Sequence, residues 1–132
     1  MNIGRPDEER AYILHVEDDP EIRLLMAGSL HELGYVVMTV GTVAEALQLA
    51  REILFDLCIL DVRLPDGSGI DLCQDLRKLQ PDARIVYYSA YVDDAAQREA
   101  LSICGDAYLR KPTSMAEWER TIAGLLDRKE PA

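Results

Sequence analysis

Short apolar runs alternate along the chain with segments in which apolar residues recur every three or four positions. The apolar runs predict buried strands at residues 12–16, 35–40, 57–60, 84–89 and 107–109. The helical spacing predicts helices at residues 20–33, 43–53, 70–79, 93–103 and 114–126. This alternation favours a parallel sheet with right-handed crossovers and helices on both faces. We therefore expect one α/β domain of the doubly wound, flavodoxin-like class.

Local signals mark several ends of these elements. Pro20 opens the first helix, and Gly34 follows its last turn. Thr42 can cap the second helix with Glu45 as its capping-box partner, and a turn is predicted at residues 65–67. On the inward faces of the first three helices we expect Ile22, Leu25, Met26, Ser29, Leu30 and Leu33, then Val43, Ala46, Leu47 and Ala50, then Ile70, Cys73, Leu76 and Leu79.

Charge and length exclude some classes of protein. The 132 residues, 48% of them apolar, suffice for one domain with its own core. A net charge of −10 argues against nucleic-acid binding, which needs a positive surface. No apolar run approaches the ~20 residues of a membrane helix, and the N-terminus is polar. We therefore expect a cytoplasmic protein without signal peptide or membrane span.

The three cysteines are Cys58, Cys73 and Cys104. Their spacing is not that of a metal site, and each lies within or beside an apolar stretch. The sequence therefore predicts reduced core residues.

Polar residues follow four of the predicted strands. In a doubly wound sheet the ligand site lies at the carboxyl ends of the strands, near the point where strand order reverses. The residues that should meet there are Glu17, Asp18, Asp19, Asp61, Ser89 and Lys111.

Carboxylates gathered in one place repel each other unless a cation compensates. Oxygen ligands suit Mg²⁺ or Mn²⁺, and Mg²⁺ typically takes one or two protein carboxylates and leaves room for water and phosphate oxygens. Such a site beside Asp61, which stands alone at the end of its strand, suggests phosphoryl transfer with Asp61 as nucleophile. The Lys111 ammonium and the Ser89 hydroxyl would bind phosphoryl oxygens.

Four separated motifs resemble those of the response-regulator receiver domain of two-component signalling. They are ILHVEDDP at residues 13–20, LDVRLPDGSG at residues 60–69, the pair Ser89-Ala90, and YLRKP at residues 108–112. The resemblance covers the chain from about residue 12 to residue 127. It implies strand order 2-1-3-4-5 with five helices, an N-terminal extension at residues 1–10, a receiver domain at 11–128 and a tail at 129–132.

The resemblance also implies a role for each residue at a motif position. Asp61 is the phosphoacceptor. The metal is bound by Asp18, Asp61 and the carbonyl of Arg63, and through water by Glu17. Phosphate binding and the conformational switch are assigned to Ser89, Ala90, Tyr108 and Lys111, and a cis peptide bond precedes Pro112. Arg63 and Tyr91 hold variable positions that tune the lifetime of the phosphoryl group.

The implied function is a signalling switch, not an enzyme with an external product. A histidine kinase or histidine phosphotransfer protein would supply the phosphoryl group. The altered conformation would act on a downstream protein, an output domain or a second copy through the face from about Asp93 to Asp127. His15 departs from the aliphatic residue usual in its strand, and we expect a hydrogen-bonded strand residue there and a solvated His31.

Each motif alone has a simpler explanation. An acidic triplet usually begins a helix, Pro-Asp-Gly is usually a turn, Ser89 could cap a helix and Tyr108 could be packing. Two other functions remain open: a metal-dependent phosphohydrolase, which usually has a second acid where Val62 and Arg63 stand, and a binding module that takes no phosphate. A stand-alone regulator and a fragment of a larger regulator or hybrid kinase are equally compatible with the sequence.

Overall fold

The structure, a computed structural model, describes residues 9–90 and 93–127. Tyr91, most of the expected N-terminal extension and the expected tail lie outside the described residues. The elements are β1 (Tyr12–Val16), α1 (Pro20–Glu32), β2 (Val36–Val40), α2 (Val43–Glu52), β3 (Leu57–Leu60), β4 (Arg63–Leu64), β5 (Gly67–Ser68), α3 (Gly69–Leu79), β6 (Arg84–Ser89), α4 (Asp94–Ile103), β7 (Ala107–Arg110) and α5 (Met115–Asp127).

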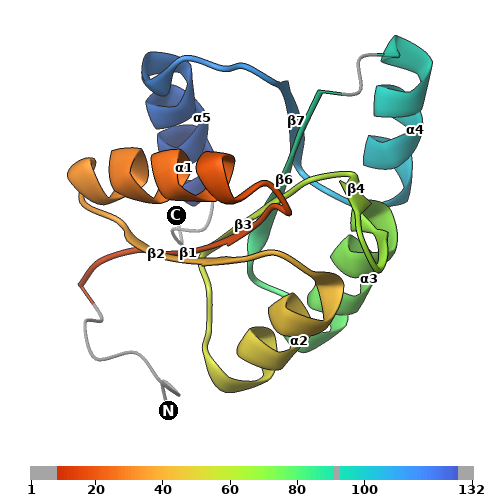
Figure 1. Ribbon diagram of the computed structural model, residues 1–132, viewed down its shortest axis with the longest axis horizontal. Coiled ribbons are helices and arrows are strands. Elements are labelled where there is room, and N and C mark those ends of the chain that lie inside the picture. Colours follow the sequence, from red (N-terminus) through yellow and green to blue (C-terminus); the bar gives the residue numbers. More distant parts are fainter. Residues whose placement is uncertain (1–8, 91–92, 128–132) are drawn as a thin grey trace.

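Five of these strands form a parallel sheet in the order β2-β1-β3-β6-β7. Numbered within that sheet, the order is 2-1-3-4-5, so the predicted fold class is confirmed. Helices α1 and α5 cover one face, and α2, α3 and α4 lie on the other side (Figure 1). The sheet therefore separates two apolar cores, and its central strands are buried on both faces, which explains their uninterrupted apolar sequences.

The expected helix signals occur in the structure. Gly34, which follows α1, has a φ of +100°, a conformation that glycine adopts without strain. The Thr42 hydroxyl accepts a hydrogen bond from the Glu45 amide at 3.1 Å, and the Glu45 carboxylate accepts one from the amide of Gly41. These bonds satisfy backbone donors at the start of α2 that the helix itself leaves unpaired.

Two residues expected on inward helix faces are exposed. Leu25 is 69% exposed because α1 turns Met26 and Leu30 toward the sheet, which leaves Leu25 outside the buried stripe. Leu79 is exposed because Gln80 takes the inward position after Leu76. The buried Gln80 side chain accepts a hydrogen bond from the Phe55 amide at 2.7 Å and donates one to the carbonyl of Ala50 at 3.0 Å.

The structure adds two short strands around the predicted turn and corrects one further expectation. The turn at residues 65–67 joins β4 and β5 in a small antiparallel hairpin. Cys73 and Cys104 form a disulfide, whereas the sequence predicts reduced thiols; Cys58 is buried and takes no part in a disulfide. The sequence could not indicate this pair, because the two cysteines are separated by 31 positions and meet only when the C-terminal end of α4 packs into the core beside α3.

No described helix has the length and apolarity needed to cross a membrane.

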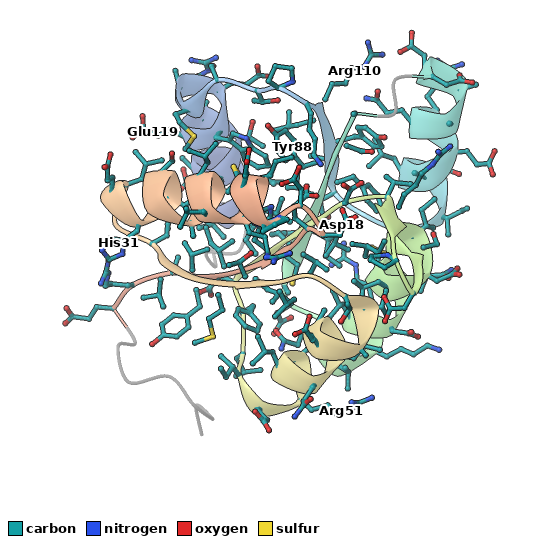
Figure 2. All side chains as sticks on the ribbon, in the orientation of Figure 1. Asp18, His31, Arg51, Tyr88, Arg110 and Glu119 are labelled. Atoms are coloured by element: carbon teal, nitrogen blue, oxygen red, sulfur yellow. A yellow bond between two sulfur atoms is a disulfide. The ribbon has the colours of Figure 1, made fainter. Side chains whose placement is uncertain are left out.

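His15 is a buried polar residue of β1. Its Nδ1 atom lies 3.3 Å from the Thr39 hydroxyl on β2, and its side chain has almost no exposure. Burial, helped by the nearby charge of Lys111, lowers the pKa of His15 to about 4, so its imidazole is neutral at pH 7. His31, by contrast, is exposed at the end of α1 (Figure 2).

Replacing His15 by leucine should reduce the loss of stability in acid. Between pH 6.5 and about pH 4 the unfolded chain binds a proton on His15 that the folded chain does not. The free energy of unfolding therefore falls as the pH drops through this window, by roughly 3 kcal/mol for a shift of this size. Urea unfolding at pH 7 and pH 4.5, with metal chelated, measures the effect in the wild type and in His15→Leu.

His31→Leu is the matched control and should keep the wild-type loss, because this histidine is exposed. An equal loss of stability in wild type and His15→Leu would contradict the assigned pKa of His15.

Candidate functional site

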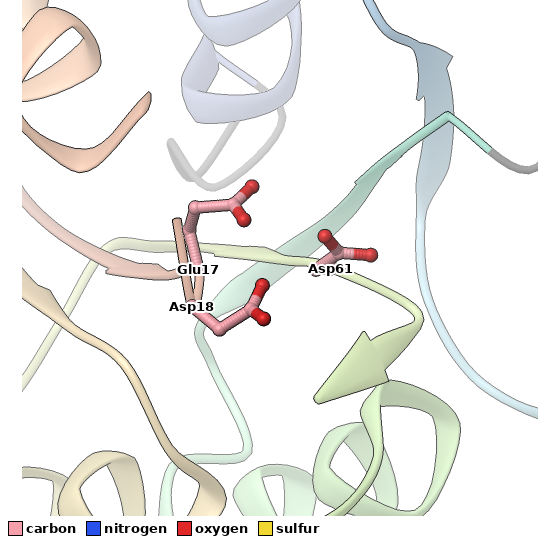
Figure 3. Close-up of side chains that lie close together, drawn as sticks. All are labelled: Glu17, Asp18 and Asp61. Carbon is pink, nitrogen blue, oxygen red and sulfur yellow. The ribbon is translucent and has the colours of Figure 1, made fainter. Parts of the chain in front are cut away.

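Three carboxylates meet at the carboxyl ends of β1 and β3 (Figure 3). Glu17 and Asp18 follow β1, and Asp61 follows β3, which pairs with β1 so that Val16 lies opposite Leu60. One oxygen of each carboxylate lies within 4.8 Å of the others. Because β2 and β3 lie on opposite sides of β1, this is the point where the strand order reverses.

Lys111 joins two of these acids. Its Nζ donates a hydrogen bond to Asp61 Oδ2 at 2.9 Å and another to Glu17 Oε1. Burial raises the pKa of Glu17, although the bond from Lys111 opposes this effect. Burial by itself would lower the pKa of Lys111, but the bonds to Glu17 and Asp61 outweigh it and raise that pKa. The lysine is therefore a stable positive charge among the carboxylates.

A pocket of about 400 Å³ opens beside this cluster. It is lined by Asp18, Asp61, Arg63, Ser89, Ala90 and Lys111. Glu17 is not among the lining residues and is only 2% exposed. Tyr108 does not line this pocket; it lines a second one that includes Val62 and Arg63. The peptide between Lys111 and Pro112 is cis, the conformation implied by the resemblance.

The acidic triplet divides into two parts. Asp19 caps α1, because its side chain accepts hydrogen bonds from the amides of Glu21 and Ile22, so the simpler explanation is correct for this residue. The Asp19 amide in turn donates to Glu17 Oε2 at 3.1 Å. The start of the helix therefore orients the buried Glu17, while Asp18 stays exposed at the pocket.

Arg23 is a part of the site that the sequence analysis missed. Its Nη1 donates to the carbonyl of Glu17 at 2.7 Å and to that of Asp18 at 3.0 Å, which fixes the acidic loop. Gly41 leaves room for it, since a Cβ atom there would lie 2.8 Å from Nη1. A basic residue in the first turn of a helix interacts unfavourably with the helix macrodipole. The position of Arg23 was therefore the one signal in the sequence that this residue has another role.

Tyr88 was also missed. Its ring centroid is 5.6 Å from the Nζ of Lys111, within the range of a cation–π contact. The Tyr88 ring packs edge-on against the Trp118 ring, with 5.0 Å between the ring centroids. The Tyr88 hydroxyl accepts a hydrogen bond from the Thr113 amide at 3.3 Å. Tyr88 thus supports Lys111 and the segment that follows it, a role that no local pattern in β6 indicates.

Gly69 allows α3 to begin directly against the Asp61 segment. A Cβ atom at this position would lie 2.0 Å from the carbonyl oxygen of Asp61, which is closer than any such contact can be. The Gly69 amide donates to the carbonyl of Val62 at 2.8 Å, and the Asp61 side chain accepts a hydrogen bond from the Arg63 amide at 3.2 Å. The backbone around Asp61 is therefore held on both sides.

Comparison with known proteins gives consistent matches. Residues 13–123 match the family model for the response regulator receiver domain. The chain is 34% identical over 125 residues to a probable transcriptional regulator, ycf27, of Guillardia theta, covering 95% of this chain and 49% of that protein. It spans half or less of the length of the first curated relatives it matches.

Two solved structures have the same fold. One is a CheY-like response regulator receiver domain protein from Methanospirillum hungatei, with a TM-score of 0.86 and 28% identity over 91% of this chain and 96% of that one. The other is a response regulator protein from Burkholderia pseudomallei with a phosphorylated aspartic acid, a calcium ion and citrate. Its TM-score is 0.79 at 32% identity, over 87% of this chain and 66% of that one.

Replacing Gly69 by alanine should destabilise the protein by about 1–3 kcal/mol, because the new methyl group forces α3 away from the Asp61 carbonyl. Urea unfolding measures this loss. Gly67→Ala is the matched control, because a Cβ atom there would make only an ordinary contact with Val43 at 3.4 Å. Equal stability of the two variants would contradict the close approach at Gly69.

Replacing Arg23 by methionine should weaken Mg²⁺ binding about tenfold, because the acidic loop loses the donor that fixes its two carbonyls. Isothermal titration with MgCl₂ measures the dissociation constant. Arg51→Met is the control, because Arg51 is exposed on α2, away from the carboxylates (Figure 2). Unchanged Mg²⁺ affinity in Arg23→Met would show that the loop needs no such support.

Proposed function

Because this chain belongs to the response regulator receiver domain family, we propose that it is a phosphorylation switch whose phosphoacceptor is Asp61. One observation carries the proposal: Asp61 lies in an open pocket, clustered with two other carboxylates and hydrogen-bonded to Lys111 at 2.9 Å. The phosphorylated aspartic acid of the Burkholderia pseudomallei response regulator supports it.

A hard divalent cation fits the donor set, and we assign it as Mg²⁺ or Mn²⁺. Three carboxylates offer oxygens within 4.8 Å of one another, and the pocket leaves space for water and phosphate oxygens. Asp18, Asp61 and the carbonyl of Arg63 would hold the ion directly, and Glu17 would hold it through water. When bound, the ion supplies the positive charge that offsets repulsion between Asp61 and the phosphoryl group. The calcium ion in the Burkholderia pseudomallei protein is consistent with this assignment.

In the proposed reaction a carboxylate oxygen of Asp61 attacks the phosphorus of a phosphohistidine. The phosphorus–nitrogen bond breaks, and its electron pair leaves with the imidazole of the donor. Lys111 donates a hydrogen bond to one phosphoryl oxygen, and the Ser89 hydroxyl donates to another. Ala90 lines the pocket beside Ser89. Water later hydrolyses the acyl phosphate, so the chain returns to its first state and is not an enzyme with an external product.

The proposed partners are a histidine kinase or a histidine phosphotransfer protein upstream, in the cytoplasm, and a downstream protein or output domain. Ser89 and Tyr108 would pass the signal to the face from about Asp93 to Asp127, where a second copy of the chain is an alternative partner. We assign residues 11–128 to the receiver unit. An output domain on the same chain is consistent with the greater length of the curated relatives.

Incubation with acetyl phosphate and Mg²⁺ should add one phosphoryl group to the wild type, measured by intact mass. Asp61→Asn should take up none, because an amide cannot form the acyl phosphate. Chelation of the metal should also abolish the addition. Asp71→Asn is the matched control, since it removes an exposed acid of α3 outside the cluster.

Phosphorylation of Asp61→Asn to the wild-type extent would place the acceptor elsewhere. A folded wild type that binds Mg²⁺ but neither takes up phosphate nor binds beryllofluoride would contradict the switch and favour a phosphate-independent binding module.

A further inference from the structure

The Cys73–Cys104 disulfide joins two helices that differ in how firmly they are held. Cys73 lies in the middle of α3, which also buries Leu72 and Leu76. Cys104 is the C-terminal cap of α4. Within Asp94–Ile103, all of which the structure describes, Ala100 is the only buried residue. The disulfide thus ties the lightly packed helix to a firmly packed one.

The non-covalent contacts described for α4 are weak by comparison. Arg110 of β7 pairs with Asp94 and lies 3.4 Å from Gln97, but the side chains of this ion pair are 47% and 70% exposed. Exposed pairs of this kind contribute little to stability. Figure 1 shows α4 at the periphery of the molecule. The covalent bond is therefore the strongest restraint on α4 within the described residues.

Space for movement lies under α4. A pocket of about 220 Å³ separates it from the segment that follows Asp61. The pocket is lined by Ala96, Glu99 and Ala100 of α4 and by Val62, Arg63 and Tyr108 on the other side. Since Val62 and Arg63 directly follow the proposed phosphoacceptor, the loosely packed side of α4 faces the site.

Cys104 also contacts the sheet. Its carbonyl accepts a hydrogen bond from the Tyr87 hydroxyl at 2.9 Å, and the Tyr87 ring lies 5.7 Å from that of Tyr108. The next residue, Gly105, has a φ of +109°, and a Cβ atom there would lie 2.6 Å from the Tyr87 ring. A restraint on Cys104 therefore extends through Tyr87 to Tyr108.

We propose that Cys73 and Cys104 form a reversible dithiol–disulfide site whose oxidised form clamps α4 against α3, and that reduction releases α4 to respond to the state of Asp61. The response to Asp61 rests on the proposed function; the clamp itself does not. Disulfides of proteins in reducing compartments are usually transient, which agrees with a reversible site in a chain that we assign to the cytoplasm.

The chemistry requires a dithiol reductant. Its thiolate attacks the sulfur of Cys104, which retains slight exposure whereas Cys73 has none. The bond between the two cysteines breaks, and Cys73 leaves as a thiolate and takes up a proton. The second thiol of the reductant then displaces Cys104, which also ends as a thiol, and the reductant becomes a disulfide. A small-molecule disulfide such as oxidised glutathione reverses the reaction through mixed disulfides.

The test compares the full chain after treatment with oxidised glutathione and after treatment with dithiothreitol. After unfolding and alkylation, the oxidised chain should carry one label, on Cys58, and the reduced chain three. Hydrogen exchange in residues 94–103 should be about tenfold faster in the reduced protein, while residues 20–32 of α1 should not change. Three labels on the oxidant-treated chain, or equal exchange of α4 in both states, would overturn the proposal.

Two variants sharpen the test. Cys58→Ala should keep the difference between the oxidised and reduced states, whereas Cys73→Ala combined with Cys104→Ala should show fast exchange of α4 under both treatments. If the double variant does not fold, the two states of the wild type decide alone. A redox effect in Cys73→Ala/Cys104→Ala equal to that of the wild type would overturn the proposal.

Adding beryllofluoride with Mg²⁺ tests the link to Asp61. The reduced protein should change its exchange in residues 94–103, and the oxidised protein should bind the ligand without that change. The same change in both states would overturn control by the disulfide. No binding in either state would contradict the proposed function, while the comparison without beryllofluoride would still decide whether the clamp exists.

Discussion

The site depends on the electrostatic balance between one ammonium group and three carboxylates. Glu17, Asp18 and Asp61 lie close enough to repel one another, and Glu17 is nearly inaccessible to water. Lys111 offsets this repulsion through hydrogen bonds to Glu17 and Asp61. A divalent cation would add further positive charge. A phosphoryl group would bring new negative charge, which the Lys111 ammonium and the divalent cation can both bind. The proposed chemistry follows from this excess of negative charge held in place.

The fold keeps these charges together. Adjacent strands β1 and β3 bring the acids side by side, and Lys111 follows β7 at the edge of the sheet. Three further residues fix the surrounding backbone or side chains. Arg23 holds the acidic loop, Gly69 permits close packing behind Asp61, and Tyr88 supports Lys111. The backbone of the site is therefore held by contacts on the side of α1 and α3, and the site faces the lightly packed α4 across a pocket.

Periodicity predicted the sheet and the five helices because buried strands and amphipathic helices leave strong local patterns. The meeting of Asp61 with Glu17 and Asp18 could be predicted, because parallel topology brings the ends of strands together. The interactions of Arg23 and Tyr88 could not, since they depend on how helices and strands dock. The disulfide was missed for the same reason, and Leu79 was misplaced because Gln80 occupies the inward position through hydrogen bonds.

The most direct test of Asp61 as the phosphoacceptor is to locate the acyl phosphate chemically. Borohydride reduces an aspartyl phosphate to homoserine, and peptide mass spectrometry then identifies the modified position. After treatment with acetyl phosphate and Mg²⁺, homoserine should appear at position 61 and at no other acid of the chain. Homoserine at Asp18, at Asp19 or at an acid outside the cluster, with none at position 61, would contradict the central role of Asp61.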